Sequence, residues 1–148
     1  MTTYTPIAYH SRNIAPIAVG SALIGAVLLA YGAHDWTEII VSASVLVAVA
    51  AVVFGLVLPK ALRKESAGGT GLALSVPAVL LTVPAFWSGL PLVLGVAGMI
   101  VGNTGRNART GSGKCIAALV LGALAVLGYA AIYVSDLVIN GSTGFLFD

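Results

Sequence analysis

Long apolar stretches separated by short polar links run along this chain. Apolar runs of about 18 residues or more are typical of helices that cross a membrane. The pattern predicts single helices over Ile14 to Gly32, over Ile39 to Leu58, where Pro59 is expected to end the helix, and from Cys115 to about Ile139. Between them lies an apolar stretch from Leu72 to Gly102 that needs a separate interpretation.

The stretch from Leu72 to Gly102 is too long for one span. A single helix of that length would measure about 46 Å, whereas the hydrocarbon core of a bilayer is about 30 Å thick. Ser88 and Gly89, followed by Pro91, are residues typical of a turn and a new helix start. The sequence therefore predicts a hairpin with its turn at Gly89.

The two helices predicted for this hairpin are Leu72 to Trp87 and Leu90 to Gly102. Pro77 and Pro84 are expected to kink the first of them. Each helix is short for a full span, which leaves three possibilities open: a locally thinned bilayer, tilted neighbours, or a re-entrant path that enters and leaves on one side.

The composition agrees with the apolar pattern. Of the 148 residues, 59% are hydrophobic and 8% charged, and the mean hydropathy is +1.04. Soluble domains carry roughly a quarter charged residues. The fold class predicted is all-α, a polytopic transmembrane helix bundle of four or five helical segments in a single domain, residues 1–148. A net charge of +2 is too small to indicate nucleic-acid binding.

The positions of the basic residues predict the topology, because short cytoplasmic loops of membrane proteins are rich in Lys and Arg. If the stretch from Leu72 to Gly102 crossed once, the seven basic residues would be divided between both sides; if it formed a hairpin, all seven would lie inside. Two crossings also gather most Trp and Tyr residues, Tyr129 and Tyr133 included, at the outer face. We expect five segments in the plasma membrane, with the N-terminus cytoplasmic and the C-terminus outside. The residues expected to fix this topology, and to attract anionic lipid head groups, are Lys60, Arg63, Lys64, Arg106, Arg109 and Lys114.

Small residues recur at helical spacing on several predicted helices. Membrane helices associate closely where small side chains let their backbones approach. The positions predicted to pack helices together are Ser21, Gly25, Ala48, Ala51, Gly55, Gly95, Gly98, Gly102, Ala118 and Gly122.

An internal repeat is suggested by two similar segments, residues 39–87 and 90–139. Each reads as a helix, a basic Gly-rich loop and a helix rich in Ala and Leu. The second copy follows the first by about 43 positions, which aligns Arg63 with Arg106. The repeat predicts two helical hairpins that have their loops on the same side.

The second copy resembles a class of small membrane proteins common in actinobacteria. The resemblance covers about a third of the chain. It rests on the runs Leu92–Gly95 and Gly98–Gly102, the basic loop with Arg106, Arg109, Gly111 and Gly113, and the run Ala117–Gly122. It implies a bacterial plasma-membrane setting and no enzyme activity. By analogy, the respiratory supercomplex of such bacteria carries small accessory subunits of this general kind.

Residues that carry chemistry are scarce in this sequence. No arrangement of nucleophile, base and acid shares a plausible face, and no cofactor motif is complete, so no catalytic residue and no cofactor are predicted. His34, Asp35, Glu38 and Asp136 are weak candidates for a metal or proton-relay cluster on the outer face. The alternative is a solvated polar loop, with acids at a helix start.

The sequence therefore predicts a non-catalytic membrane protein, an accessory or structural subunit of a larger complex. Its expected partners are the lipid bilayer and other membrane protein subunits. Nucleic acid is not expected as a partner. The alternative left open is a homo-oligomeric channel or small-solute carrier.

Overall fold

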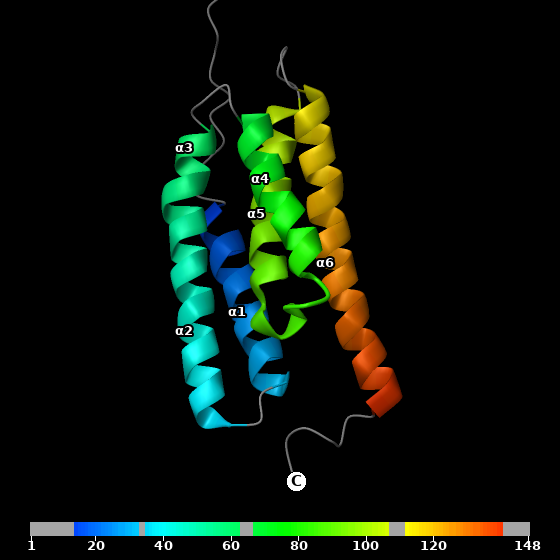
Figure 1. Ribbon diagram of the computed structural model, residues 1–148. Coiled ribbons are helices and arrows are strands. Elements are labelled where there is room, and N and C mark those ends of the chain that lie inside the picture. Colours follow the sequence, from blue (N-terminus) through cyan, green and yellow to red (C-terminus); the bar gives the residue numbers. More distant parts are fainter. Residues whose placement is uncertain (1–13, 33–34, 63–66, 107–111, 141–148) are drawn as a thin grey trace, which may run out of the picture.

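The computed structural model describes residues 14–32, 35–62, 67–106 and 112–140, and it contains no strand in these ranges. The predicted all-α fold is therefore confirmed for the described residues (Figure 1). In chain order the elements are α1 (Ile14–Gly32), α2 (Trp36–Val52), the π-helical turn η2 (Val53–Val57), α3 (Leu58–Leu62), α4 (Ala67–Leu81), the 3-10 turn η3 (Phe86–Ser88), α5 (Leu90–Gly105) and α6 (Ser112–Asn140).

Helix α1 has the bounds predicted from its apolar run, but the helix that follows differs from its prediction. The chain continues through α2, η2 and α3, so Pro59 lies inside a helix and does not end it. Proline has no N–H, and its ring clashes with a carbonyl about one turn earlier. The wider π-helical turn ends at Val57, two residues before Pro59, and the N–H of Leu58, which follows the turn, bonds to the carbonyl of Val53. We infer that this turn accommodates the ring without ending the helix.

The predicted hairpin is present as α4 and α5, with a correction to its first helix. Pro77 lies inside α4, but α4 ends at Leu81, so Pro84 lies in the turn and kinks no helix. Gly89 has φ +68°, a left-handed conformation that glycine adopts without steric cost. Pro91 occupies the first turn of α5, where its missing N–H costs nothing.

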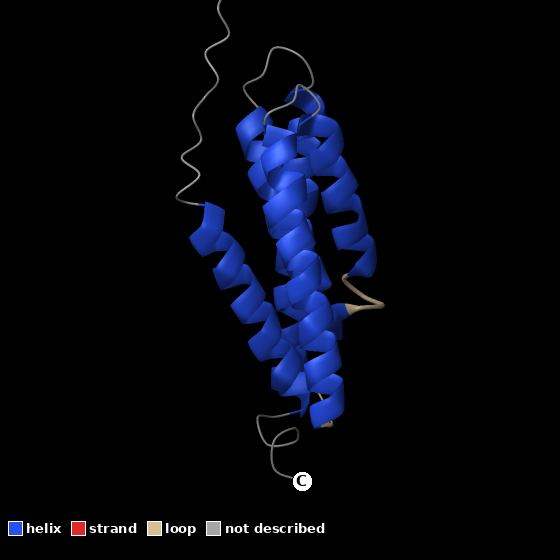
Figure 2. Ribbon diagram, turned by 90° about the vertical axis from the view of Figure 1, so that its left-hand side faces the viewer, coloured by secondary structure: helices blue, strands red, loops and turns tan. Residues whose placement is uncertain are grey.

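The helices form a tight trio and a pair beside it. Helices α4, α5 and α6 make the most extensive mutual contacts, and α1 packs on α2, on α5 and on η3 (Figures 1 and 2). A buried apolar cluster joins the two groups across α5. Its members include Leu46, Ala50, Phe54 and Leu58 from the α2–α3 helix and Val93, Ala97 and Val101 from α5.

The α4–α5 hairpin is shorter than the helices around it. Helix α4 has 15 residues and α5 has 16, about 22 and 24 Å at 1.5 Å per residue. Helix α6 has 29 residues and measures about 43 Å. Both ribbon views show the hairpin turning back before the lower ends of α2 and α6 are reached (Figures 1 and 2).

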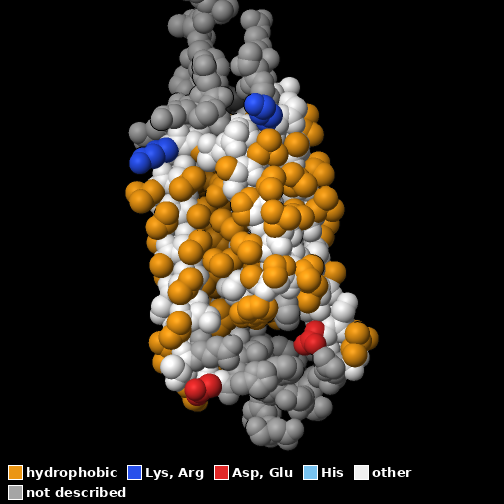
Figure 3. Space-filling model, in the orientation of Figure 1, with side chains coloured by type: hydrophobic (Ala, Val, Ile, Leu, Met, Phe, Trp, Pro, Cys, Tyr) orange, Lys and Arg blue, Asp and Glu red, His pale blue; other side chains and the backbone are white. Residues whose placement is uncertain are grey.

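The outside of the protein is apolar along most of its length. Figure 3 shows hydrophobic side chains covering the middle, with Lys and Arg at one end and Asp and Glu at the other. Two segments, Ile39–Leu62 and Ser112–Asp136, are long and apolar enough to cross a membrane. In the most apolar 18-residue window of each segment, 22% and 28% of the residues are buried, whereas a core helix of a soluble protein is mostly buried.

Candidate helix-packing site

Glycines bring the backbones of α5 and α6 into direct contact. A Cβ placed on Gly102 would lie 2.6 Å from the carbonyl oxygen of Cys115 and 2.8 Å from the backbone nitrogen of Leu119. A Cβ on Gly122 would lie 2.6 Å from the carbonyl oxygen of Gly95. These distances leave no room for a side chain, because the atoms met are backbone and cannot rotate away. Gly95, Gly102 and Gly122, all predicted to pack helices, thus lie together in one interface.

Helix α4 joins this interface through a serine that the sequence did not single out. The Ser75 hydroxyl is fully buried and donates a hydrogen bond of 2.7 Å to the carbonyl oxygen of Ala118 on α6. Gly98 on α5 leaves space for Ser75, since a Cβ there would collide with the Ser75 hydroxyl. One serine therefore lies where all three helices meet. Gly98 and Ala118 were predicted packing positions, whereas Ser75 was not.

We expect replacement of Ser75 by Ala to destabilise the protein by about 1 kcal/mol, typical of hydrogen bonds between membrane helices. The hydroxyl is lost and the Ala118 carbonyl loses its cross-helix donor. Thr104→Val is the control, because the Thr104 hydroxyl bonds only within its own helix, to Ile100. Unfolding of both variants in mixed micelles of increasing SDS content, followed by circular dichroism, measures the difference. Equal stability of Ser75→Ala and wild type would contradict the prediction.

A second close contact ties α1 and α2 to the hairpin turn. A Cβ on Gly89 would lie 3.3 Å from the Cα of Gly25, and Leu46 of α2 fills the space beside both glycines. Leu46 is fully buried, and Ser21 of α1 is also buried. Ser21 and Gly25 were predicted from the small-residue pattern. Leu46 was missed, because one leucine in a run of Val, Ala and Leu has no sequence signal that distinguishes it.

The small-residue stripe predicted on the second helix does not pack inside this chain. Ala48, Ala51 and Gly55 are exposed, and a Cβ on Gly55 would meet no atom within 4 Å. The buried face of the same helix carries other residues, among them Ala50, Phe54 and Leu58. The stripe is exposed in this chain because small residues permit close approach but do not select the face that packs.

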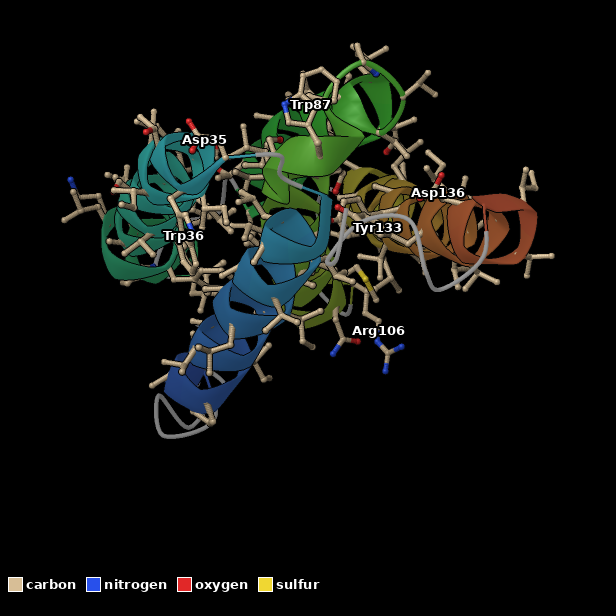
Figure 4. All side chains as sticks on the ribbon, turned by 90° about the horizontal axis from the view of Figure 1, so that it is seen from below. Asp35, Trp36, Trp87, Arg106, Tyr133 and Asp136 are labelled. Atoms are coloured by element: carbon tan, nitrogen blue, oxygen red, sulfur yellow. The ribbon has the colours of Figure 1, made fainter. Side chains whose placement is uncertain are left out.

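The candidate metal ligands that the structure describes do not come together in one cluster. Asp35 precedes α2 and Asp136 lies near the end of α6; viewed from below, they lie on opposite sides of the bundle (Figure 4). No three His, Cys, Asp or Glu residues of the described chain could hold a metal ion together. The sequence brought these acids to one end correctly but could not show that α2 and α6 lie far apart there. His34 lies outside the described residues, and Glu38 lies in the first turn of α2.

The described basic residues share one end of the molecule, as the hairpin prediction requires. Lys60 lies in α3, Arg106 directly follows α5 and Lys114 lies in the first turn of α6. These three helix ends lie together in Figure 1. Arg63, Lys64 and Arg109 lie outside the described residues.

Comparison with protein-family models, with curated proteins and with solved structures finds no match to this chain.

Two tyrosines of α6 take part in packing inside the bundle. Tyr129 is 1% exposed, and its ring lies 5.0 Å from that of Tyr133, centroid to centroid. The Tyr133 hydroxyl donates a 3.3 Å hydrogen bond to the carbonyl of Leu28 in α1 (Figure 4). The two residues thus pack α6 against the rest of the bundle. Sequence position alone placed them near the right end of α6 but could not assign the face.

Proposed function

We propose that this chain is a non-catalytic membrane protein that serves as an accessory or structural subunit of a larger membrane complex. The observation that carries the proposal is the apolar character of the protein's exterior. Exposed apolar side chains such as Val27, Val52 and Leu127 cover the length of the bundle between its charged ends. Soluble monomers rarely expose contiguous apolar patches larger than a few hundred Å², so a bilayer and neighbouring helices are the surroundings that suit this surface.

The spacing of the charged ends fits a bilayer. Along α6, Lys114 and Asp136 are separated by about 33 Å at 1.5 Å per residue. The hydrocarbon core is about 30 Å thick. We therefore place Lys114 and Asp136 at opposite membrane surfaces. By the excess of Lys and Arg in cytoplasmic loops, the basic end faces the cytoplasm, which gives a multi-pass protein of the plasma membrane with a cytoplasmic N-terminus and its C-terminus outside.

The way the interior is packed supports a structural role. The contacts between α4, α5 and α6 are made by glycines and by the serine–carbonyl bond, which fix helices relative to one another. The exposed stripe of Ala48, Ala51 and Gly55 on α2 is a face that another membrane helix can approach closely. We propose that this face of α2 contacts the partner subunits.

The proposed duplication is supported by contacts between equivalent positions. Ser75 and Ala118, which bond to each other, are 43 residues apart, the same offset as the sequence repeat. Pairs with this offset also share the buried cluster: Ala50 with Val93, Phe54 with Ala97, and Leu58 with Val101. Contacts of this kind are expected where two copies of one hairpin pack face to face.

A homo-oligomeric channel or small-solute carrier is the second candidate, and the hairpin favours it. Non-helical backbone at membrane depth occurs where it is buried in protein or lines a water-filled cavity. The turn from Thr82 to Gly89 is such a segment if the hairpin does not reach the far surface.

Purification of the tagged full-length protein from its native membrane in a gentle detergent, followed by mass spectrometry, tests the two candidates. An accessory subunit is recovered in fixed stoichiometry with the same larger membrane proteins in repeated preparations. A tagged Gly55→Leu chain, altered on the exposed stripe, should lose or weaken that association while keeping its own fold. Recovery of this chain alone, as a homo-oligomer, would contradict the accessory role and favour the channel, which flux measurements in liposomes would then examine.

A further inference from the structure

The turn of the α4–α5 hairpin lies well inside the length of its neighbours. Its position along α1 and α2 is marked by the contacts of Gly89 with Gly25 and Leu46. From those contacts to the end of α1 is about 10 Å, and to the start of α2 about 15 Å, at 1.5 Å per residue.

Helix α6 gives an independent measure of the same depth. A Cβ on Gly128 would lie 3.3 Å from the methyl carbon of Thr82, where α4 gives way to the turn. From Gly128 to Asp136 is about 12 Å along α6. All three neighbours therefore place the start and end of the turn about 10 Å or more from the acidic end. Figures 1 and 2 show the hairpin turning back before the lower ends of α2 and α6 are reached.

The turn has the chemistry of a segment built for apolar surroundings. It contains no charged residue between Thr82 and Gly89. Val83 is 75% exposed and Trp87 is 49% exposed. An apolar side chain this exposed, far from both charged ends, suits hydrocarbon better than water.

Several polar backbone groups of the turn are hydrogen-bonded within the hairpin. The N–H of Ala85 bonds to the carbonyl of Leu81, and the N–H of Ser88 bonds to the carbonyl of Ala85. The Ser88 hydroxyl donates to Ala85 and accepts from the N–H of Leu90. Pro84 has no N–H to satisfy. Non-helical backbone at membrane depth is ordinarily buried in protein or lines a water-filled cavity, because an unsatisfied polar group costs several kcal/mol in hydrocarbon. The bonds within the hairpin lower that cost for this turn, which is what contact with lipid requires.

We propose that α4–α5 is a re-entrant hairpin, which enters and leaves at the basic end, and that its turn is covered by phospholipid acyl chains of the leaflet at the acidic end. This inference rests on the proposed membrane embedding but not on the accessory role. Acyl chains are the occupant because both ends of the turn, Thr82 and Gly89, lie about 10 Å or more from the acidic surface and the turn presents exposed apolar side chains. The lipid contacts would be made by Leu80, Val83 and Trp87.

The two tryptophans of the chain allow a direct test. Trp36 starts α2 beside Asp35 at the acidic end, and Trp87 lies on the hairpin turn (Figure 4). Trp36→Phe leaves Trp87 as the sole tryptophan, and Trp87→Phe leaves Trp36. Each full-length variant is placed in vesicles of phosphatidylcholine brominated at a shallow, middle or deep carbon of the acyl chain. Bromine quenches tryptophan fluorescence only near contact.

We expect the fluorescence of Trp87 to be lost most strongly with bromine at the middle or deep carbons. Trp36 should be quenched most by the shallowest bromine and by aqueous iodide. Strongest quenching of Trp87 by iodide or by shallow bromine would overturn the inference, since the turn would then lie at the membrane surface. Quenching of Trp87 by neither lipid nor iodide would also overturn it, because protein would then cover the turn.

The Trp87→Phe variant, which retains Trp36, separates a wrong depth of the turn from a failure of membrane embedding. If brominated lipid quenches neither tryptophan and the protein does not float with the vesicles, the proposed membrane function fails as well. A nitroxide attached at Val83→Cys gives a second reading of depth that leaves both tryptophans in place; native Cys115 is only 2% exposed. Greater accessibility to oxygen than to a water-soluble nickel chelate is the expected result, and the reverse order would contradict the re-entrant path.

Discussion

Replacing Gly102 by Ala is expected to destabilise the protein by about 2 kcal/mol or more, within the range for overpacking a well-packed core. The new methyl group would lie 2.6 Å from one backbone atom of α6 and 2.8 Å from another. Neither the Cys115 carbonyl nor the Leu119 nitrogen can move without shifting α6 itself. The methyl group is therefore accommodated only if α5 and α6 separate, which weakens contacts along the whole interface.

Gly20→Ala and Gly55→Ala are the matched controls for this effect. A Cβ at either position would meet no atom within 4 Å. In a helix, Ala is favoured over Gly by up to about 1 kcal/mol, so both variants should be as stable as wild type or slightly more stable. The measurement is SDS-induced unfolding in mixed micelles, followed by circular dichroism. If Gly55→Ala lowered the stability as much as Gly102→Ala, the exposed stripe of α2, and not the α5–α6 interface, would govern stability.

Replacing Leu46 by Ala should cost about 2 kcal/mol or more, because large-to-small changes at fully buried sites leave a cavity. Leu46 fills the space between Gly25 of α1 and Gly89 of the hairpin turn. Its loss would leave α1 and the turn without the side chain that joins them. The neighbouring Val47 is 56% exposed, so Val47→Ala should change stability by less than about 0.5 kcal/mol.

The two variants can be compared by hydrogen exchange as well as by unfolding. We expect Leu46→Ala to increase exchange in α1 and in the turn while α5 and α6 stay protected, because the glycine interface of those helices does not involve Leu46. Uniform loss of protection over all helices, or equal effects of Leu46→Ala and Val47→Ala, would show that this junction has no special role.

Much of the fold follows from properties that act locally. The apolar run from Ile14 to Gly32 forms α1 with its predicted bounds, because helix length in such a run is limited by the polar residues at its ends. The hairpin turn at Gly89 could be predicted because Ser-Gly followed by Pro restricts the backbone before any tertiary contact forms. The position of the basic helix ends at one end of the bundle could be predicted in the same way, from the distribution of Lys and Arg along the chain.

The features that were missed depend on which face of a helix packs. Small residues occur on both faces of these helices, so periodicity could not separate Gly102, which meets backbone, from Gly55, which meets nothing. Tyr129 and Leu46 are buried in the folded bundle, and Leu46 contacts α1 and the hairpin turn, which are distant from it in sequence. Pro59 was read as a stop because the sequence does not show that a π-helical turn precedes it.

The depth of the hairpin could be limited but not determined from the sequence. The short runs on either side of Gly89 showed that full crossing was difficult, and they left thinning, tilt and a re-entrant path equally open. Only the contacts of Gly89 with Gly25 and of Gly128 with Thr82 fix the level of the turn against its neighbours.

Labelling of single cysteines from one side of the membrane tests the central claim, a bilayer-embedded bundle with its basic end in the cytoplasm. Asp35→Cys, Lys60→Cys and Arg106→Cys are exposed positions at the two ends, and the wild type with its buried Cys115 is the background control. In bacterial spheroplasts, a membrane-impermeant maleimide should label Asp35→Cys at once and the other two only after lysis. Labelling of Lys60→Cys and Arg106→Cys from opposite sides would contradict the account, because the segment between them would then cross the membrane once.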